Sequence, residues 1–339
     1  MQTRHNHSDS HCPSHNRGRY HGESGCGCGY ACSRGRGYSR SCHDHTQRRG
    51  PSNLAAVLWA FAAVGLFALI YVSGKLSGTN ASALQIIWLR YAGGLVTMIL
   101  MLVMQRNRGG SLTTTQPFLH ACRAAAGGFG GVAAVYAAAN MPVASASAIG
   151  LMDGFLTVLL GLIVLREHVS RPQWLATLIS LAGAMIVVGA QGAFSTWDAE
   201  LAGPAIIALA GALFVAIESI MIKTLAKTEA AFTILLYVNL FGFLILAWPG
   251  LTYWHAIPLQ WMLAFCCLGP VAILAQYCNI KAFRLAKASI VGPIRYTWII
   301  YGSVFGVLLF DEPVTVAMGI GVGLVLVGGG WLAALRSRH

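Results

Sequence analysis

The sequence predicts an all-α integral membrane protein, with ten transmembrane helices arranged as two inverted five-helix repeats. Composition is the first reason, because 56% of the 339 residues are hydrophobic and only 10% are charged, whereas soluble domains carry about 25% charged residues. The second reason is a series of apolar runs from Leu54 onward, each near the ~20 residues that cross a bilayer core. The third reason is a pattern that recurs in the two halves of the chain.

The apolar runs are expected to be helices, because a helix pairs every backbone N–H and C=O within its own segment. Clusters of Gly, Pro and charged residues separate the runs, for example at 105–110 and 166–172. The expected spans are 54–74, 83–104, 118–139, 144–165, 172–190, 202–225, 231–248, 260–282, 288–309 and 314–335.

Lys and Arg lie mostly at one end of the expected bundle. With the N-terminus in the cytoplasm, that end holds the eight Arg of the tail and Arg106, Arg108, Arg166, Arg171, Lys223, Lys227, Lys281, Arg284, Lys287, Arg336 and Arg338. The opposite end holds Lys75, Asp198, Glu200, Asp311 and Glu312. The positive-inside rule then predicts a multi-pass protein of the cytoplasmic membrane with both termini in the cytoplasm. It also accounts for most of the formal net charge of +12, so no nucleic-acid partner is expected.

The two halves share a register 145 residues apart, and Glu167 with Glu312 is the informative match because carboxylates are scarce here. Each Glu is expected to close a continuous apolar helix. Five is an odd number, so the second repeat must cross the membrane in the opposite sense, as in many secondary transporters. The expected domains are a disordered tail at 1–50 and repeats at 54–190 and 202–335. Further matches are Ala137 with Ala282, Ile149 with Ile294, Gly161 with Gly306, Val169 with Val314, Leu181 with Leu326, and Gly183 with Gly328.

Each repeat ends in a similar stretch, LREHVSRPQWLATLISLAGAMIVVG in the first and LFDEPVTVAMGIGVGLVLVGG in the second. Over residues 54–335 the chain resembles the EamA-type transporters of the drug/metabolite transporter superfamily. The sequence departs from the family pattern at Arg166 and Asp311, where Gly is common, and also at Pro142 and Lys287. The resemblance implies ten helices, a central cavity between the halves, and transport of a small organic solute.

Ionisable groups inside spans are candidates for the site, because a charge at the bilayer centre costs at least ~2.5–3.5 kcal/mol. Arg90, Asp153 and Arg295 fall at depths that allow an Arg–Asp pair near the midplane, or an Arg that holds an anionic group of the solute. The alternative is a structural ion pair without ligand contact. Asp153 is also a candidate for the coupling proton, because burial disfavours a charged carboxylate.

Polar and aromatic residues on the eighth and ninth spans are candidates for the cavity wall, since binding sites combine aromatic walls with a few polar groups. They are Gln276, Tyr277, Tyr296 and Trp298. Trp298 is the repeat equivalent of Asp153. The alternative is an interfacial aromatic belt or plain packing.

Other features have ordinary structural explanations. Glu218 is also an ionisable group inside a span, close to its cytoplasmic end. A local ion pair with Lys223 or snorkelling is the favoured interpretation, and substrate binding is the alternative. His120 and Arg123 open the third span at the basic side, where positive residues need no special role. Small residues four apart predict close helix packing, at Gly150–Gly154, Gly302–Gly306 and Gly319–Gly323.

The tail is rich in potential metal ligands, with seven His between His5 and His45 and five Cys, at Cys12, Cys26, Cys28, Cys32 and Cys42. Their spacing does not match a zinc-finger pattern, and the composition cannot build a core, so no metal site is assigned. Three interpretations of the tail stay open, namely metal binding by its Cys and His side chains, an extension upstream of the true start of the protein, and contact of a basic tail with anionic lipid.

The expected function is secondary active transport of a small organic, amino-acid-like solute by alternating access. The alternative is a metal-linked transporter or sensor that uses the tail. The HExxH, nucleophile-elbow and Walker signatures are not found in the sequence, so neither an enzyme nor a cofactor is expected. The expected partners are the solute, the lipid bilayer and protons, with a homodimer left open.

Overall fold

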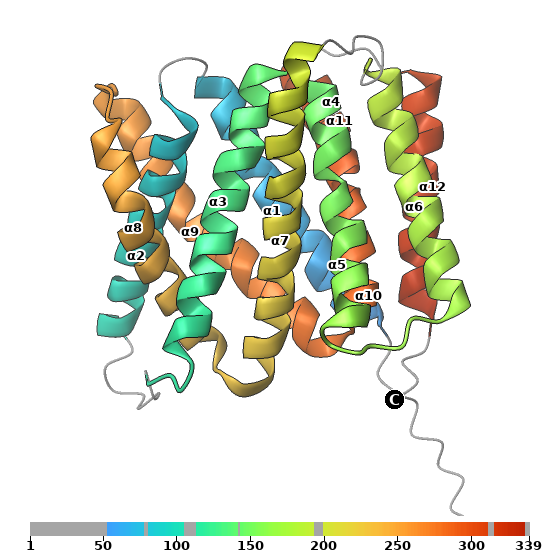
Figure 1. The fold of residues 1–339 in the computed structure, drawn as a ribbon, viewed down its shortest axis with the longest axis horizontal. Helices are drawn as coiled ribbons and strands as arrows, with labels where there is room; N and C mark the ends of the chain where they lie inside the picture. The colour runs from blue at the N-terminus through green and yellow to red at the C-terminus, as the bar shows by residue number, and fades with distance from the viewer. Residues whose placement is uncertain are drawn as a thin grey trace, which may run out of the picture. The chain divides into compact units, whose positions relative to one another are not determined.

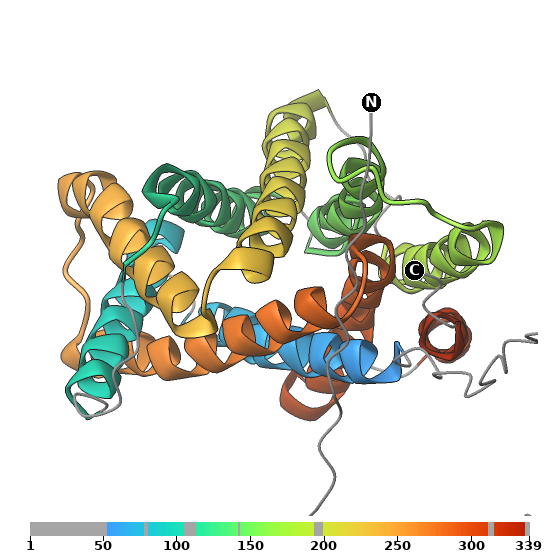
Figure 2. The same cartoon turned by 90° about the horizontal axis from the view of Figure 1, so that it is seen from below.

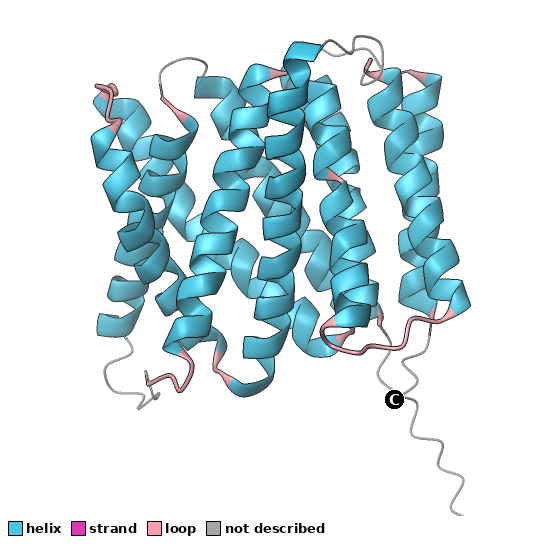
Figure 3. Cartoon of the chain, viewed as in Figure 1, coloured by secondary structure: helices cyan, strands magenta, loops and turns pink. Residues whose placement is uncertain are grey.

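The structure is a computed structural model that describes residues 53–77, 81–104, 113–141, 143–192, 199–310 and 315–335. Every regular element in these ranges is a helix (Figure 3). The elements are α1 (Leu54–Ser77), α2 (Ala83–Met104), α3 (Pro117–Asn140), α4 (Val143–Gly150), α5 (Met152–Ile163), α6 (Arg171–Ala190), η2 (Ala199–Leu201), α7 (Ala202–Thr228), α8 (Ala231–Thr252), α9 (Leu259–Leu285), α10 (Ala288–Ile294), η3 (Arg295–Thr297), α11 (Trp298–Phe310) and α12 (Val316–Ala334). The tail at 1–50 and Glu312 lie outside the described residues.

The described elements fit the predicted fold class. Eight apolar helical stretches are long enough to cross a membrane, and the α4–α5 segment forms one of them. The apolar helix α1 and the segment α10–η3–α11 complete the ten predicted spans. The protein is therefore an all-α, multi-pass membrane protein.

The packing of the helices follows the inverted repeat. α1 packs along α9, and α7 packs along α3 (Figures 1 and 2). In the repeat register α1 corresponds to α7 and α3 corresponds to α9, so these two contacts are equivalent. Likewise α6 packs along its own equivalent, α12, at one side of the bundle in Figure 1. This exchange of equivalent contacts is what a two-fold relation between the halves produces.

Glycines bring α6 and α12 into close contact. A Cβ on Gly183 would lie 2.6 Å from the carbonyl oxygen of Gly321, and a Cβ on Gly328 would lie 2.1 Å from Ser180 Oγ. Gly183 on α6 and Gly328 on α12 are repeat equivalents, so each helix uses the same position to approach the other closely. Only a residue without a side chain fits at either position.

The glycine spacings singled out in the sequence are mostly not packing sites. A Cβ added at Gly302, Gly319 or Gly323 would meet no neighbouring atom within 4 Å, so the prediction of close packing at these positions is wrong. Gly154 does pack closely, since a Cβ there would lie 3.0 Å from the ring of Tyr296. Membrane helices expose glycine to open space as well as to neighbours, so spacing alone does not separate the two.

The spans predicted as continuous helices at 144–165 and 288–309 are both interrupted. In the first, α4 ends at Gly150 and α5 begins at Met152, with a turn at Leu151 (Figure 3). In the second, α10 ends at Ile294 and the 3₁₀ turn η3 precedes α11. Leu151 lies 145 residues before the centre of η3, so the two breaks are equivalent in the repeat. Discontinuous helices at equivalent positions are typical of binding sites in transporters with inverted repeats.

The second break follows Pro293, which has no backbone N–H and whose ring displaces the carbonyl one turn earlier, at Ser289. The backbone N–H of Trp298 bonds to the carbonyl of Arg295, three residues before it. This tight turn places Arg295 near the middle of the bundle. The position equivalent to Pro293 before the first break is Ala148, so a break at this place does not require proline.

Cations gather at one end of the bundle, which we call the basic end, at the bottom of Figure 1. It holds the ends of α5, α7 and α9 and the residues Arg166, Arg171, Lys227, Arg284 and Lys287. Polar contacts tie helices together here. Lys223 Nζ donates to the carbonyls of Phe283, at 2.6 Å, and of Ala286, and Glu167 Oε2 accepts from the backbone N–H of Ser289 at 3.3 Å.

Candidate functional site

A cavity of about 220 Å³ lies between α1, α3, the α4–α5 segment, α7 and the turn at η3. Its walls are mostly small and apolar. On α3 they reach Ala137 near the end of that helix, and on α7 they reach Ala208 near its start. The cavity therefore extends from the middle of the bundle toward the end opposite the basic end.

An ion pair between the repeats forms part of the wall. Asp153 Oδ2 lies 2.7 Å from Arg295 Nε and 2.6 Å from Arg295 Nη2. Both residues line the cavity, and their side chains are 15% and 27% exposed, respectively. The pair exists because each residue sits at a helix break, Asp153 in the first turn of α5 and Arg295 at the start of η3. A carboxylate and a guanidinium on one wall can bind complementary charges of a solute.

Trp298 also lines the cavity. It stands 145 residues after Asp153, so the two equivalent positions of the repeat meet at one cavity. An indole face can pack against an apolar group or attract a cation. Asp153, Arg295 and Trp298 are thus the sequence-predicted residues that the structure brings together.

Tyr296 and Tyr277 lie elsewhere. Tyr296 is fully buried against Gly154, and its hydroxyl has no hydrogen-bond partner among the described residues. The Tyr277 ring packs edge-on against Trp59, and Lys281 Nζ lies 5.4 Å from the ring centroid. The cavity-lining residues in the described part of the chain include neither tyrosine.

Arg90 and Gln276 belong to a second polar region. Arg90 is buried, with its guanidinium carbon 4.4 Å from the centroid of the Tyr91 ring. Gln276 Oε1 accepts a hydrogen bond of 2.6 Å from Arg123 Nη2. Depth in the membrane allowed either Arg90 or Arg295 to pair with Asp153. In the structure the partner is Arg295.

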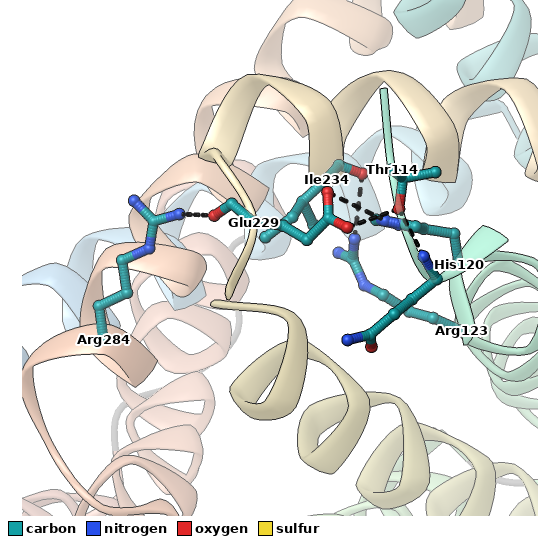
Figure 4. A network of polar contacts seen from close by, with 7 residues as sticks. Thr114, His120, Arg123, Glu229, Ile234 and Arg284 are labelled. Carbon is teal, nitrogen blue, oxygen red and sulfur yellow. Dashed lines mark hydrogen bonds and ion pairs between the residues drawn. The ribbon is translucent and has the colours of Figure 1, made fainter. Parts of the chain in front are cut away.

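Arg123 organises this second region in the basic half of the bundle (Figure 4). Its side chain is fully buried. Besides the Gln276 bond, Nη1 donates to the carbonyl of Ile234 at 3.3 Å. Its Nε lies 3.8 Å from Glu218 Oε1. The prediction that Glu218 pairs locally with Lys223 is wrong, because Lys223 is bonded to the end of α9.

His120 lies one turn nearer the basic end and is also buried. Its ring stacks on Tyr237 with centroids 5.0 Å apart, and Nε2 lies 3.7 Å from Glu229 Oε2. Thr114 Oγ1 donates to Glu229 Oε1 at 2.5 Å, and Arg284 donates to the Glu229 carbonyl (Figure 4). This network joins α3 to the α7–α8 link and to α9. The sequence did not predict that His120 and Arg123 are buried, because residues at the start of a span are expected at the membrane interface.

Within the ranges that the structure describes, there is no group of three or more His, Cys, Asp or Glu side chains that could hold a metal ion. The Cys and His of the tail lie outside those ranges.

The model of the EamA-like transporter family matches residues 54–189 and 203–332, and the chain belongs to this family. The pseudopaline exporter CntI of Pseudomonas aeruginosa is 27% identical over 276 residues, which cover 80% of this chain and 93% of the exporter. An S-adenosylmethionine uptake transporter of Rickettsia bellii is 22% identical over 243 residues, which cover 71% of this chain and 80% of that relative. A solved crystal structure has the same fold, with a TM-score of 0.70 and 20% identity over 83% of this chain and 98% of that chain. The chain is a membrane transporter of a family whose members carry different small metabolites.

Proposed function

We propose that the protein is a secondary active transporter that moves a small organic solute by alternating access between its two inverted repeats. The observation that carries this proposal is the Asp153–Arg295 pair, which is partly exposed to a cavity at the point where two broken segments face each other. Each repeat supplies one member of the pair. Movement of one repeat against the other would change both the pair and the cavity, as alternating access requires.

The wall chemistry favours an amino-acid-like solute. A zwitterion can place its carboxylate on Arg295 and its ammonium group on Asp153, replacing part of the ion pair with two charge-assisted contacts. The rest of the solute would then meet Trp298, Phe67 and the small apolar residues of the cavity. A solute without net charge suits this wall, because Asp153 and Arg295 neutralise each other.

We further propose that the basic end faces the cytoplasm and that the cavity extends toward the outer side of the cytoplasmic membrane. The positive-inside rule supports this orientation. It predicts that a cysteine placed at His168, in the α5–α6 link, reacts from the cytoplasm and one at His255, in the α8–α9 link, reacts from outside. Labelling of both positions from the same side would contradict the inverted arrangement and the orientation.

We also propose that residues 1–50 form a tail that transport does not require. A chain beginning at Ser52 should insert into membranes, run as a monodisperse species and bind the same solute as the full chain. Loss of solute binding on truncation, restored in the full chain only with added Zn²⁺, would instead favour the metal-linked reading.

A thermal-shift screen of the purified full chain tests the function. Amino acids, nucleosides, vitamins and sulfonium compounds are added, and α-amino acids or close relatives are expected to raise the unfolding temperature. Each active amino acid is paired with its carboxamide and with its deaminated analogue, both of which should fail. The shift should disappear in Arg295→Gln and persist in Arg171→Ala, an exposed Arg at the basic end. Stabilisation only by compounds that lack both groups would overturn the proposed solute class.

A further inference from the structure

Glu218 lies one helical turn beyond the cavity, on the seam between α3 and α7. On α7 the lining residues Gly211 and Val215 precede it at helical spacing. On α3, Gly127 lies one turn nearer the basic end than the lining residue Gly130. A Cβ on Gly127 would lie 2.8 Å from Glu218 Cδ, so the absence of a side chain at position 127 makes room for the carboxylate. The 13% exposure of the Glu218 side chain gives it limited access to water.

The Glu218 pair is built differently from the Asp153 pair. Asp153 has two contacts of 2.6 and 2.7 Å with Arg295, whereas Glu218 lies 3.8 Å from Arg123 Nε, beyond hydrogen-bonding distance. Both Nη atoms of Arg123 are already bonded to neutral oxygens. Arg123 therefore keeps these two bonds when Glu218 takes up a proton, while protonation of Asp153 would remove the carboxylate that holds Arg295.

The pair also crosses between the repeats, with Arg123 on α3 and Glu218 on α7. Among the described residues, Arg123 on α3, Tyr91 on α2 and Arg295 in η3 interact electrostatically with Glu218. The carbonyl of Ile234 on α8 and the amide of Gln276 on α9 complete the surroundings of Arg123. Glu218 thus interacts with both the buried Arg123 and the cavity-lining Arg295.

We propose that Glu218 carries the coupling proton of this transporter, and that its protonation releases the Arg123 contact that holds the basic half closed. This inference rests on the proposed function. A proton from water adds to the partly exposed carboxylate of Glu218 and removes its negative charge, while Arg123 keeps its own charge and its two hydrogen bonds. The attraction between α3 and α7 weakens, and α7 moves away from α3 at the basic end, while Arg123 keeps α3 bonded to α8 and α9. Release of the proton at the basic end restores the pair. Asp153, which the sequence offered as the candidate for the coupling proton, binds the solute in this scheme.

Hydrogen–deuterium exchange of the full chain in lipid nanodiscs tests the proposal without any solute. Exchange is compared at pH 8 and pH 5, after correction for the intrinsic effect of pH on amide exchange. Segments 123–130 and 215–222, which flank the Arg123–Glu218 contact on α3 and α7, should exchange about tenfold faster at pH 5 because these two helices separate there. Glu218→Gln should exchange fast at both pH values, and Glu218→Asp should keep the pH response.

Asp153→Asn is the matched carboxylate control and should keep the pH response. His120→Gln should also keep it, which separates Glu218 from the His120–Glu229 contact. A pH response that persists in Glu218→Gln, or that disappears in Asp153→Asn or His120→Gln, would overturn the proposal. If Glu218→Gln does not yield folded protein, Gly127→Ala moves the carboxylate instead, and an unchanged midpoint pH of the response in that variant would also overturn it. Failure of the solute screen has no bearing on this readout, so the two proposals fail separately.

Discussion

Asp153 and Glu218 are both carboxylates inside membrane helices, and each faces an Arg of the other repeat. The Asp153–Arg295 pair has short contacts and borders a cavity. In the Glu218–Arg123 pair the distance from Oε1 to Nε is 3.8 Å, and Arg123 is hydrogen-bonded to Ile234 and Gln276. A partly exposed pair can exchange its partners for a solute. A carboxylate that faces a buried Arg held by other bonds can lose its charge without displacing that Arg. The difference suggests separate roles in binding and in coupling.

Removing Arg123 should have the largest effect on stability. Arg123→Ala leaves the Glu218 carboxylate without its cation and removes the bonds to Ile234 and Gln276. We expect the free energy of unfolding to fall by about 3–5 kcal/mol, as measured by denaturant titration in detergent. The exposed Arg171→Ala is the control and should change it by about 0.5 kcal/mol or less. A similar small effect for both variants would mean that the Arg123 cluster does not hold the basic half together.

Asp153→Asn should lower the free energy of unfolding less than Arg123→Ala does. Arg295 loses its anion but keeps an oxygen acceptor, and its 27% exposure lets water in the cavity solvate the charge. We expect a loss of about 1–3 kcal/mol in the same titration, with a monodisperse, folded protein. A loss as large as that of Arg123→Ala would show that the Asp153 pair is a structural lock rather than a binding wall.

Gly127→Ala tests the space around Glu218. The new methyl group would clash with the carboxylate, and such overpacking costs about 1–3 kcal/mol, while the better helix propensity of Ala returns about 0.5–1 kcal/mol. The net destabilisation should therefore lie between about 0 and 2.5 kcal/mol, depending on how far the flexible Glu218 side chain shifts. Gly319→Ala, where the structure offers open space, should be neutral or slightly stabilising. Equal behaviour of the two variants would contradict the position of Glu218 against α3.

Tyr296→Phe should have the smallest effect. The hydroxyl is buried without a hydrogen-bond partner among the described residues, so its removal should change the free energy of unfolding by less than about 1 kcal/mol. Solute binding should persist, because the cavity-lining residues of the described ranges do not include Tyr296. A loss of solute binding in Tyr296→Phe would show that Tyr296 also belongs to the binding site.

The fold could be predicted from hydropathy, charge asymmetry and the register of the repeat. These signals are averages over whole spans, and they are insensitive to a single turn. The breaks at Leu151 and at η3 were therefore missed, although Pro293 was a local signal for the second. The breaks depend on backbone bonding within one turn, which apolar composition does not report.

The site was only partly predictable. Helix depth correctly allowed Asp153 to meet Arg295, because rise per residue fixes the level of a side chain in the membrane. Depth does not fix the direction in which a side chain points around the helix axis. Gln276 and Arg90 consequently fell in the other polar region, and Arg123 was taken for an interfacial cation although it is fully buried.

The most direct test of the separate roles is the dissociation constant of an amino-acid-like ligand from the solute screen. It is measured at equilibrium for the full chain and for Asp153→Asn, Arg295→Gln and Arg171→Ala. We predict that binding weakens at least about tenfold, or about 1.4 kcal/mol, in the first two variants and is unchanged in Arg171→Ala. Folded Asp153→Asn and Arg295→Gln proteins that bind the ligand as tightly as the unmodified chain would contradict the assignment of this ion pair to the solute.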